Sequence, residues 1–187
     1  MKKSILSLSI IAVSALAFVS FKNADAFKGG SYVAVEEEAG EMNPLWADYK
    51  SWYHITKGNP NTGDPTGFLD GKHKGTKAYR EIYINKVGEA VHKQSGNPKY
   101  PEGTVIVKES YGNQKKWEAQ GNPQLTIMVK LKAGESPESG DWGWVMGGKG
   151  KISTGTSKWA KFCSKCHIYG AANDYTFMTS DFIKNNQ

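Results

Sequence analysis

Residues 79–84, Tyr-Arg-Glu-Ile-Tyr-Ile, are the segment from which the fold can be worked out. Successive side chains of a β-strand point to opposite faces, so Arg80 and Ile82 share one face of an extended segment here. The segment is also rich in aromatic and β-branched residues, which are common in strands. It therefore predicts a β-strand.

Three later segments have the same character, namely residues 103–109, 125–132 and 142–146. In the third predicted strand, Leu125, Ile127, Val129 and Leu131 form an apolar face suited to the core. The opposite face carries Thr126, Met128 and Lys130. We expect these strands to form a mainly antiparallel sheet.

Helical segments flank the predicted strands. Residues 85–95 predict a short helix that Asn85 caps and Gly96 ends. Residues 157–166 predict the last helical segment, near the C-terminus. The short helix is expected to turn three residues inward, namely Val87, Ala90 and Val91.

A further helix is predicted before the first strand, over residues 43–53, because Asn43 can cap it and Pro44 fits its first turn. Residues 57–77 are turn-rich, with many glycine, proline, asparagine and threonine residues. The predicted fold class is therefore α+β, a mainly antiparallel sheet with flanking helices. The apolar stripe of the first helix would comprise Leu45, Tyr49, Trp52 and Tyr53.

The start of the chain predicts export. Residues 1–3 are a basic n-region, residues 5–21 are apolar, and Ala-Asp-Ala at 24–26 is a cleavage signal. We expect residues 1–26 to be a signal peptide, with a soluble periplasmic chain beginning near Phe27. The alternative is an uncleaved anchor helix, which the serines, the alanines and the cleavage signal disfavour.

The rest of the chain predicts a polar leader, residues 27–42, and one domain, residues 43–187. The sequence has 24 basic and 18 acidic residues, for a net charge of +6. The lysines are scattered and interleaved with acidic residues, which argues against a nucleic-acid surface. No segment after the signal peptide is apolar enough to cross a bilayer.

Near the C-terminus stands the motif Cys163-Ser-Lys-Cys166-His167. Two thiols at this spacing can add to the two vinyl groups of one haem, and the adjoining histidine can bind its iron. A disulfide would explain neither the spacing nor His167, and a zinc site would need another ligand. The motif therefore predicts one covalent c-type haem, with Cys163 and Cys166 as thioether anchors and His167 as the proximal iron ligand.

Seven segments, in order along the chain, carry a resemblance to a known family: residues 49–52, 80–85, 103–109, 125–130, 141–144, 163–167 and 173–178. On these segments the chain resembles the cytochrome P-460 family, together with the related β-type cytochromes c′. This resemblance implies a homodimer of antiparallel-sheet subunits and a haem with an open distal side. Members of the family oxidise hydroxylamine or bind nitric oxide.

The resemblance also singles out Lys108 and Thr126. In the hydroxylamine-oxidising members, a lysine at the place of Lys108 is bonded to the porphyrin edge. The alternatives are a lysine paired with Glu109 or a haem propionate, or a lysine that is only solvated. Those members place a distal carboxylate where this chain has Thr126, and threonine is no general base at pH 7. Strand parity points Glu81 and Glu109 away from this face.

The identity of a sixth iron ligand is open. Met128 could bind the iron, which would give a six-coordinate electron carrier, or it could fill an apolar gap. Three histidines are further candidates. His92 is expected on the outer side of its helix, His73 in a polar loop, and His54 at the end of the first helix, capping its carbonyls.

Arg80 is a candidate for binding a propionate or an anionic ligand, and alternatively for pairing with an acid of the fold. Trp142 and Trp144 share a face, and they either pack in the core, contact the haem or line a dimer interface. Three functions follow for a haem protein of this kind: hydroxylamine oxidation, nitric oxide binding, or electron transfer through Met128-ligated haem. Lys108 favours the first and Thr126 the second, and a periplasmic cytochrome is a candidate electron partner.

Overall fold

The computed structural model describes residues 41–57, 60, 62 and 79–185. The predicted signal peptide, nearly all of the leader, most of residues 57–77 and His73 lie outside the described residues. All described residues belong to one compact unit, residues 34–187. Within the described part of the chain, no helix has the length and apolar character needed to cross a membrane.

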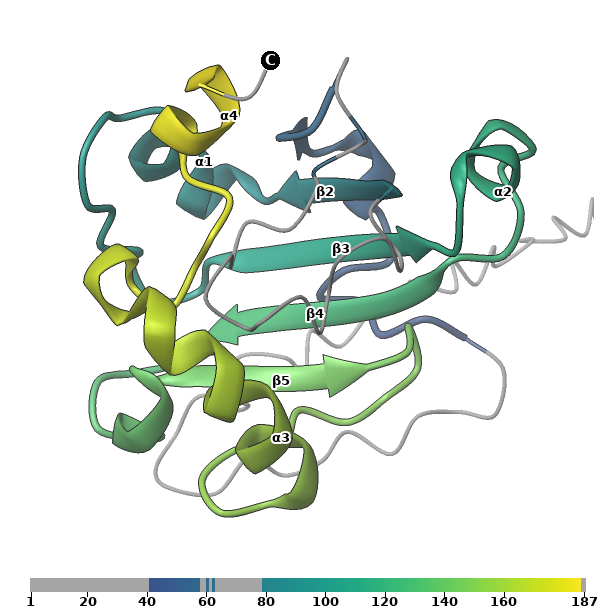
Figure 1. Cartoon of the computed structure of the whole chain (residues 1–187). Helices are drawn as coiled ribbons and strands as arrows, with labels where there is room; N and C mark the ends of the chain where they lie inside the picture. Colours follow the sequence, from purple (N-terminus) through teal and green to yellow (C-terminus); the bar gives the residue numbers. More distant parts are fainter. Residues whose placement is uncertain (1–40, 58–59, 61, 63–78, 186–187) are drawn as a thin grey trace, which may run out of the picture. The chain divides into compact units, whose positions relative to one another are not determined.

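One five-stranded antiparallel sheet forms the centre of the described chain, with the strands in their sequence order. Figure 1 shows β2 to β5 side by side, each running opposite to its neighbour. This order needs only hairpin-type connections. The strands are β1 Tyr53–His54, β2 Tyr79–Ile84, β3 Val105–Tyr111, β4 Gln124–Lys130 and β5 Trp142–Met146.

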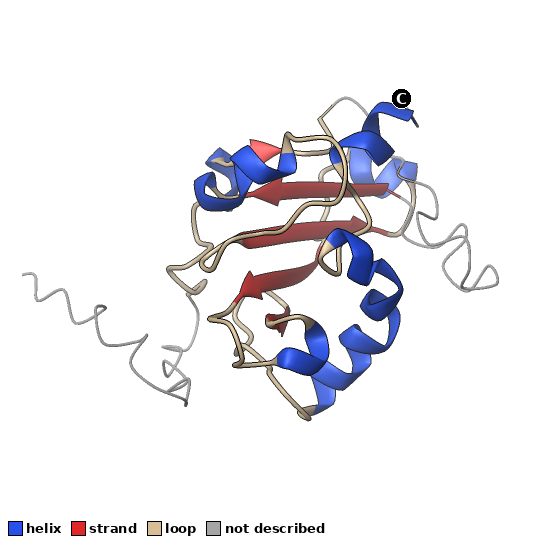
Figure 2. Ribbon diagram, turned by 90° about the vertical axis from the view of Figure 1, so that its left-hand side faces the viewer, coloured by secondary structure: helices blue, strands red, loops and turns tan. Residues whose placement is uncertain are grey.

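Helices flank the sheet, which confirms the predicted α+β class (Figure 2). The predicted helices over 85–95 and 157–166 correspond to α1 and α3. The described α-helices are α1 Lys86–His92, α2 Gln114–Glu118, α3 Lys158–His167 and α4 Ser180–Asn185, and the 3-10 helices are η2 Tyr49–Ser51, η3 Pro137–Ser139 and η4 Ile168–Asn173.

The predicted helix over residues 43–53 is wrong. Turns occupy residues 44–48, η2 follows, and the chain then enters β1, which pairs with β2. Trp46 and Tyr49 are buried, and the Trp46 indole donates to the Gly148 carbonyl at 2.7 Å, whereas Leu45 is exposed. A continuous helix would not allow β1 to pair, so long-range contacts override the local helical pattern.

Helix α1 is capped by Asn85 as predicted, because the Asn85 side chain accepts from the Gly88 amide. The predicted inward face is right for Val91, which packs against the core, and wrong for Val87 and Ala90, which are exposed. His92 is buried instead. The reason is the close approach at Gly88, where an added Cβ would overlap the side chain of Thr104. The helix therefore packs through Gly88 and His92 as well as Val91, and hydrophobic periodicity does not reveal the first two contacts.

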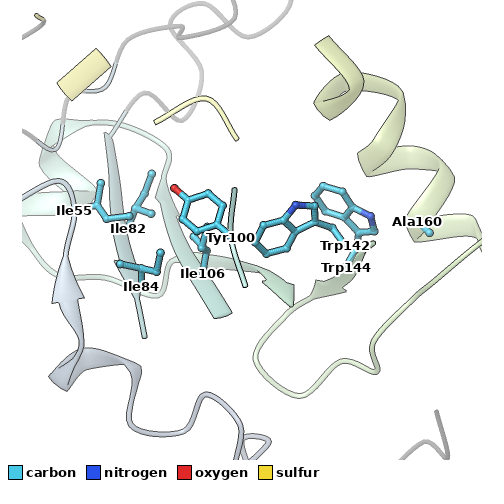
Figure 3. Packing of buried hydrophobic residues seen from close by; sticks show 8 residues of the cluster. All are labelled: Ile55, Ile82, Ile84, Tyr100, Ile106, Trp142, Trp144 and Ala160. Atoms are coloured by element: carbon cyan, nitrogen blue, oxygen red, sulfur yellow. The ribbon is translucent and has the colours of Figure 1, made fainter. Parts of the chain in front are cut away.

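Both faces of the sheet are covered in the described structure. Ile127, Val129 and Leu131, predicted for the core face of β4, are each exposed by 2% or less. On the other face, isoleucines, Tyr100 and two tryptophans form a cluster, with the tryptophans next to Ala160 of α3 (Figure 3). This second cluster comprises Ile55, Ile82, Ile84, Tyr100, Ile106, Trp142, Trp144 and Ala160.

Candidate functional site

Helix α3 carries the Cys-x-x-Cys-His motif in its last turns. Its buried Ala160 anchors it against the sheet, and residues three and four positions later lie on the same side of a helix. Cys163 accordingly packs against the same cluster as Ala160. Both cysteines are half-buried, and both are free thiols with no disulfide between them.

His167 is held in a defined orientation and tautomer. Its Nδ1 lies 2.7 Å from the Tyr175 carbonyl oxygen, and a carbonyl can only accept, so Nδ1 carries the hydrogen. The lone pair is therefore on Nε2, the nitrogen that can bind a metal. The ring lies between Trp144 and Phe177, with centroid distances of 4.7 and 5.0 Å.

Cys163 lies close enough to Lys108 for the lysine charge to act on the thiol. Burial raises the pKa of Cys163 to about 11, and a smaller opposing effect comes from the positive charge of Lys108. The thiol is therefore protonated at neutral pH. The structure thus brings together two of the predicted site residues, one from α3 and one from the middle of β3.

The strand register places five of the predicted site residues on one face of the sheet. Lys108 is opposite Thr126, and Met128 is opposite Trp144. Arg80 lies on the same face, near the start of β2, because it is opposite Ser110, two positions from Lys108. Its guanidinium donates to the hydroxyl of Thr62. This face is the one that α3 covers, since Trp144 packs in the cluster with Ala160.

Met128 packs against the cluster on this face. Its neighbours across the strands are Ile106 and Trp144, both buried. Contacts of this kind are those of a methionine that fills an apolar gap.

Glu81 and Glu109 lie on the opposite face, as strand parity predicts, and are paired across β2 and β3. Glu109 is buried, accepts from the hydroxyls of Tyr49 at 2.5 Å and Tyr111 at 3.0 Å, and forms an ion pair with Lys50. These bonds hold the carboxylate on the side of the sheet away from α3.

Two of the candidate histidines have partners inside the fold. His54 Nε2 donates to Glu81 at 2.5 Å, so the predicted capping role in a helix is wrong. His92 is 4% exposed, and its Nδ1 lies 3.1 Å from the hydroxyl oxygen of Tyr100. The predicted outward position of His92 is therefore wrong as well. Burial, with a contribution from the Lys93 charge, lowers the pKa of His92 to about 4.

The residues around His167 suit a large apolar cofactor with charged edges. The indole Nε1 of Trp144 is buried and has no acceptor among the residues that the structure describes. A buried donor without a partner costs about 1–3 kcal/mol, which an added acceptor would recover. Phe162, next to Cys163, is 65% exposed and offers apolar surface beside the thiols. Two thiols, an oriented imidazole and an orphaned donor fit a haem with its propionates.

Tyr175 and Phe177 were not predicted as site residues. Tyr175 acts through its backbone carbonyl, which any residue would provide, so its role has no sequence signature. Phe177 contacts His167 across the turn that follows η4. The only available signal was the resemblance of the tail, residues 173–178, to the family.

An antiparallel sheet whose covering helix ends in Cys-x-x-Cys-His, with an oriented imidazole, defines a haem-binding class of protein. The profile of the family described as Cytochrome P460 matches residues 46–178, which include the whole sheet and the motif. The chain therefore belongs to the cytochrome P460 family and is a haem cytochrome. No curated protein matches the chain.

Proposed function

We propose that this chain is a periplasmic cytochrome that binds one haem covalently through Cys163 and Cys166, with His167 as the proximal iron ligand. The observation that carries the proposal is the bond from His167 Nδ1 to the Tyr175 carbonyl, which leaves Nε2 as the metal-binding atom. Each thioether forms by addition of a thiol S–H across a vinyl group, so attachment needs no external oxidant. Bound haem supplies an iron that changes oxidation state and binds small ligands.

Mass spectrometry of the denatured protein tests this attachment. We expect the chain matured in a periplasm to carry the mass of one haem, and its mass also reports whether residues 1–26 are removed. Replacing both cysteines with serine should abolish the added mass, whereas Ser164→Ala, between them, should not. His167→Ala should change the iron spectrum while covalent haem remains. An unchanged spectrum would refute His167 as the ligand.

We further propose that the sixth iron position is open and binds nitric oxide. His54 is bonded to Glu81, His92 to Tyr100, and Met128 packs against Ile106 and Trp144. Among the residues that the structure describes, these contacts occupy the side chains that were candidates for the sixth position. Apolar neighbours suit an uncharged ligand such as nitric oxide.

Absorption spectra of the ferrous protein test the open site. We expect a five-coordinate high-spin spectrum that nitric oxide converts under anaerobic conditions. Met128→Leu should leave the spectrum without nitric oxide unchanged, because leucine fills similar space but cannot bind iron. A low-spin spectrum that becomes high-spin in this variant would instead support the electron-transfer alternative.

Hydroxylamine oxidation is a second candidate, favoured by the proximity of Lys108 to Cys163. Since Cys163 would be bonded to the haem, this proximity supports a Lys108 cross-link to the porphyrin edge. Forming the N–C bond removes one hydrogen from Nζ and one from the porphyrin carbon. The two electrons must go to a two-electron oxidant, for which we propose a peroxide.

Digestion and mass spectrometry test the cross-link. Haem peptides of the peroxide-treated protein should contain residues from β3 and α3 and weigh two hydrogens less than their sum. Lys108→Ala should lose this product and its red-shifted ferrous absorption, whereas Lys115→Ala, an exposed lysine of α2, should retain both. Intact separate peptides in the wild type would refute the cross-link and leave nitric oxide binding as the function.

The proposal also includes assembly and electron transfer. We propose a homodimer, with electrons passing to a periplasmic cytochrome, and no role for nucleic acid. Support comes from the chain's family and from its predicted export signal. Light scattering of the haem-loaded protein tests the dimer, and a monomer mass would refute it.

A further inference from the structure

The turn at Asp174 and Tyr175 holds the proximal histidine. Both residues have left-handed backbones, with φ of 52° and 64°, which cost energy for residues other than glycine. The Tyr175 amide donates to the Gly170 carbonyl at 2.8 Å, and the Tyr175 carbonyl accepts from His167. The position of this carbonyl therefore depends on whatever stabilises the unfavourable turn.

A buried ion pair fixes the first residue of the turn. The Asp174 carboxylate is bonded to Lys130 Nζ at 2.7 Å and to the Tyr100 amide at 2.8 Å. The Asp174 carbonyl accepts from the Trp142 indole at 2.8 Å. Asp174 is 5% exposed, so its partners compensate the loss of water.

Lys130 links this turn to the sheet. It lies at the end of β4, also donates to the Gly140 carbonyl at 2.7 Å, and stands 5.0 Å from the Trp142 ring centroid. Its side chain is 13% exposed. The ammonium therefore joins strand β4, the loop at Gly140 and the turn after η4 at one buried point.

Gly140 fixes the second residue of the turn by contact. A Cβ added at Gly140, whose φ is 64°, would overlap the ring of Tyr175. The ring thus lies directly against the glycine backbone. Lys130 therefore holds Asp174, and Gly140 holds Tyr175.

We propose that Lys130 and Asp174 are positioning residues that tune the haem iron by fixing the acceptor of the His167 Nδ1–H bond. The inference rests on the proposed ligation of iron by His167. An acceptor on Nδ1 makes the imidazole a stronger donor to the metal, which stabilises ferric iron and lowers the reduction potential. Loosening the turn weakens this hydrogen bond.

The substitution Lys130→Met tests the inference, because methionine has a similar length and no charge. We expect the reduction potential to rise and the iron–histidine stretching frequency of the ferrous protein, measured by resonance Raman spectroscopy, to fall. Loss of a positive charge acting through space would instead lower the potential, because a nearby cation favours ferrous iron. The sign of the shift therefore separates positioning from simple electrostatics.

Gly140→Ala is the second variant, and it leaves the charge unchanged. Its Cβ would displace Tyr175, so the potential and the stretching frequency should move in the same directions as in Lys130→Met. If Lys130→Met yields no haem-loaded protein, Gly140→Ala tests the inference through the same two measurements. Lys93→Met, which removes a lysine paired with Glu89 on α1, should change neither quantity.

The outcomes distinguish this inference from the proposed function. If the wild-type protein has no iron–histidine band, the open sixth position is refuted, and the direction of the change in reduction potential in Lys130→Met then tests the inference by itself. If the band is present, an unchanged frequency with an unchanged or lower potential in Lys130→Met overturns the inference alone. A Gly140→Ala protein with an unchanged reduction potential and an unchanged iron–histidine frequency also overturns the inference.

Discussion

At the scale of single residues, the sequence identifies the side chains of the site. It does not identify the backbone contact that orients one of them, His167. The spacing of Cys163, Cys166 and His167 predicts haem attachment because the chemistry requires those residue types at that spacing. The acceptor for His167 is a backbone carbonyl, which leaves no trace in the residue type. The proximity of Lys108 to Cys163 likewise arises only when α3 packs on the sheet.

Thr126 decides, in our proposal, between ligand binding and catalysis. It is half-buried and directly opposite Lys108 on the face that α3 covers. Thr126→Glu introduces a carboxylate that can accept protons from hydroxylamine, and general bases contribute on the order of 10²-fold or more. We expect a hydroxylamine oxidation rate raised by about 10²-fold, measured with an artificial electron acceptor.

Thr126→Gln is the matched control, because glutamine has the size of glutamate but is not a base. It should leave the rate of hydroxylamine oxidation near that of the wild type. Equal rates in the two variants would mean that position 126 does not determine the chemistry.

At the scale of secondary structure elements, the prediction succeeded where local pattern and tertiary contacts agree. The predicted strands 79–84 and 142–146 have the same limits as β2 and β5. It failed over residues 43–53, where burial of Trp46 and pairing of β1 outweigh helix propensity. The five-residue helix α2 was not predicted, because one turn and a half gives too short a periodic pattern.

Helix α1 makes a prediction about pH, because its packing buries His92. The pKa of His92 is about 4 in the folded chain, against an ordinary value near 6.5 when unfolded. Between about pH 4 and pH 6.5 the His92 imidazole is therefore protonated in the unfolded chain and neutral in the folded chain. The free energy of unfolding should be largest above about pH 6.5 and fall by about 3 kcal/mol towards pH 4.

Denaturant unfolding between pH 4 and 7 measures this dependence. His92→Gln should remove most of it, since glutamine does not titrate. Lys99→Gln, an exposed substitution on the loop after α1, should retain it. The assignment to His92 fails if the slope persists in His92→Gln.

At the scale of the whole described unit, the sheet separates two sets of polar groups. One face carries Lys108 and Thr126 beneath α3, and the other carries Glu109 with its tyrosines. Glu109 lies opposite Leu125 in the strand register, and the Leu125 side chain is on the face away from Thr126. Stability and haem chemistry should therefore respond to different substitutions.

Glu109→Gln tests this separation. Glutamine has one acceptor oxygen and no charge, so it cannot accept from both Tyr49 and Tyr111 while pairing with Lys50. We expect the free energy of unfolding to fall by about 1–3 kcal/mol, while the ferrous spectrum and the iron–histidine frequency stay unchanged. Glu102→Gln, at an exposed position, should change the stability by less than about 0.5 kcal/mol. A shifted iron–histidine frequency at full stability in Glu109→Gln would mean that the two faces are coupled through the strands.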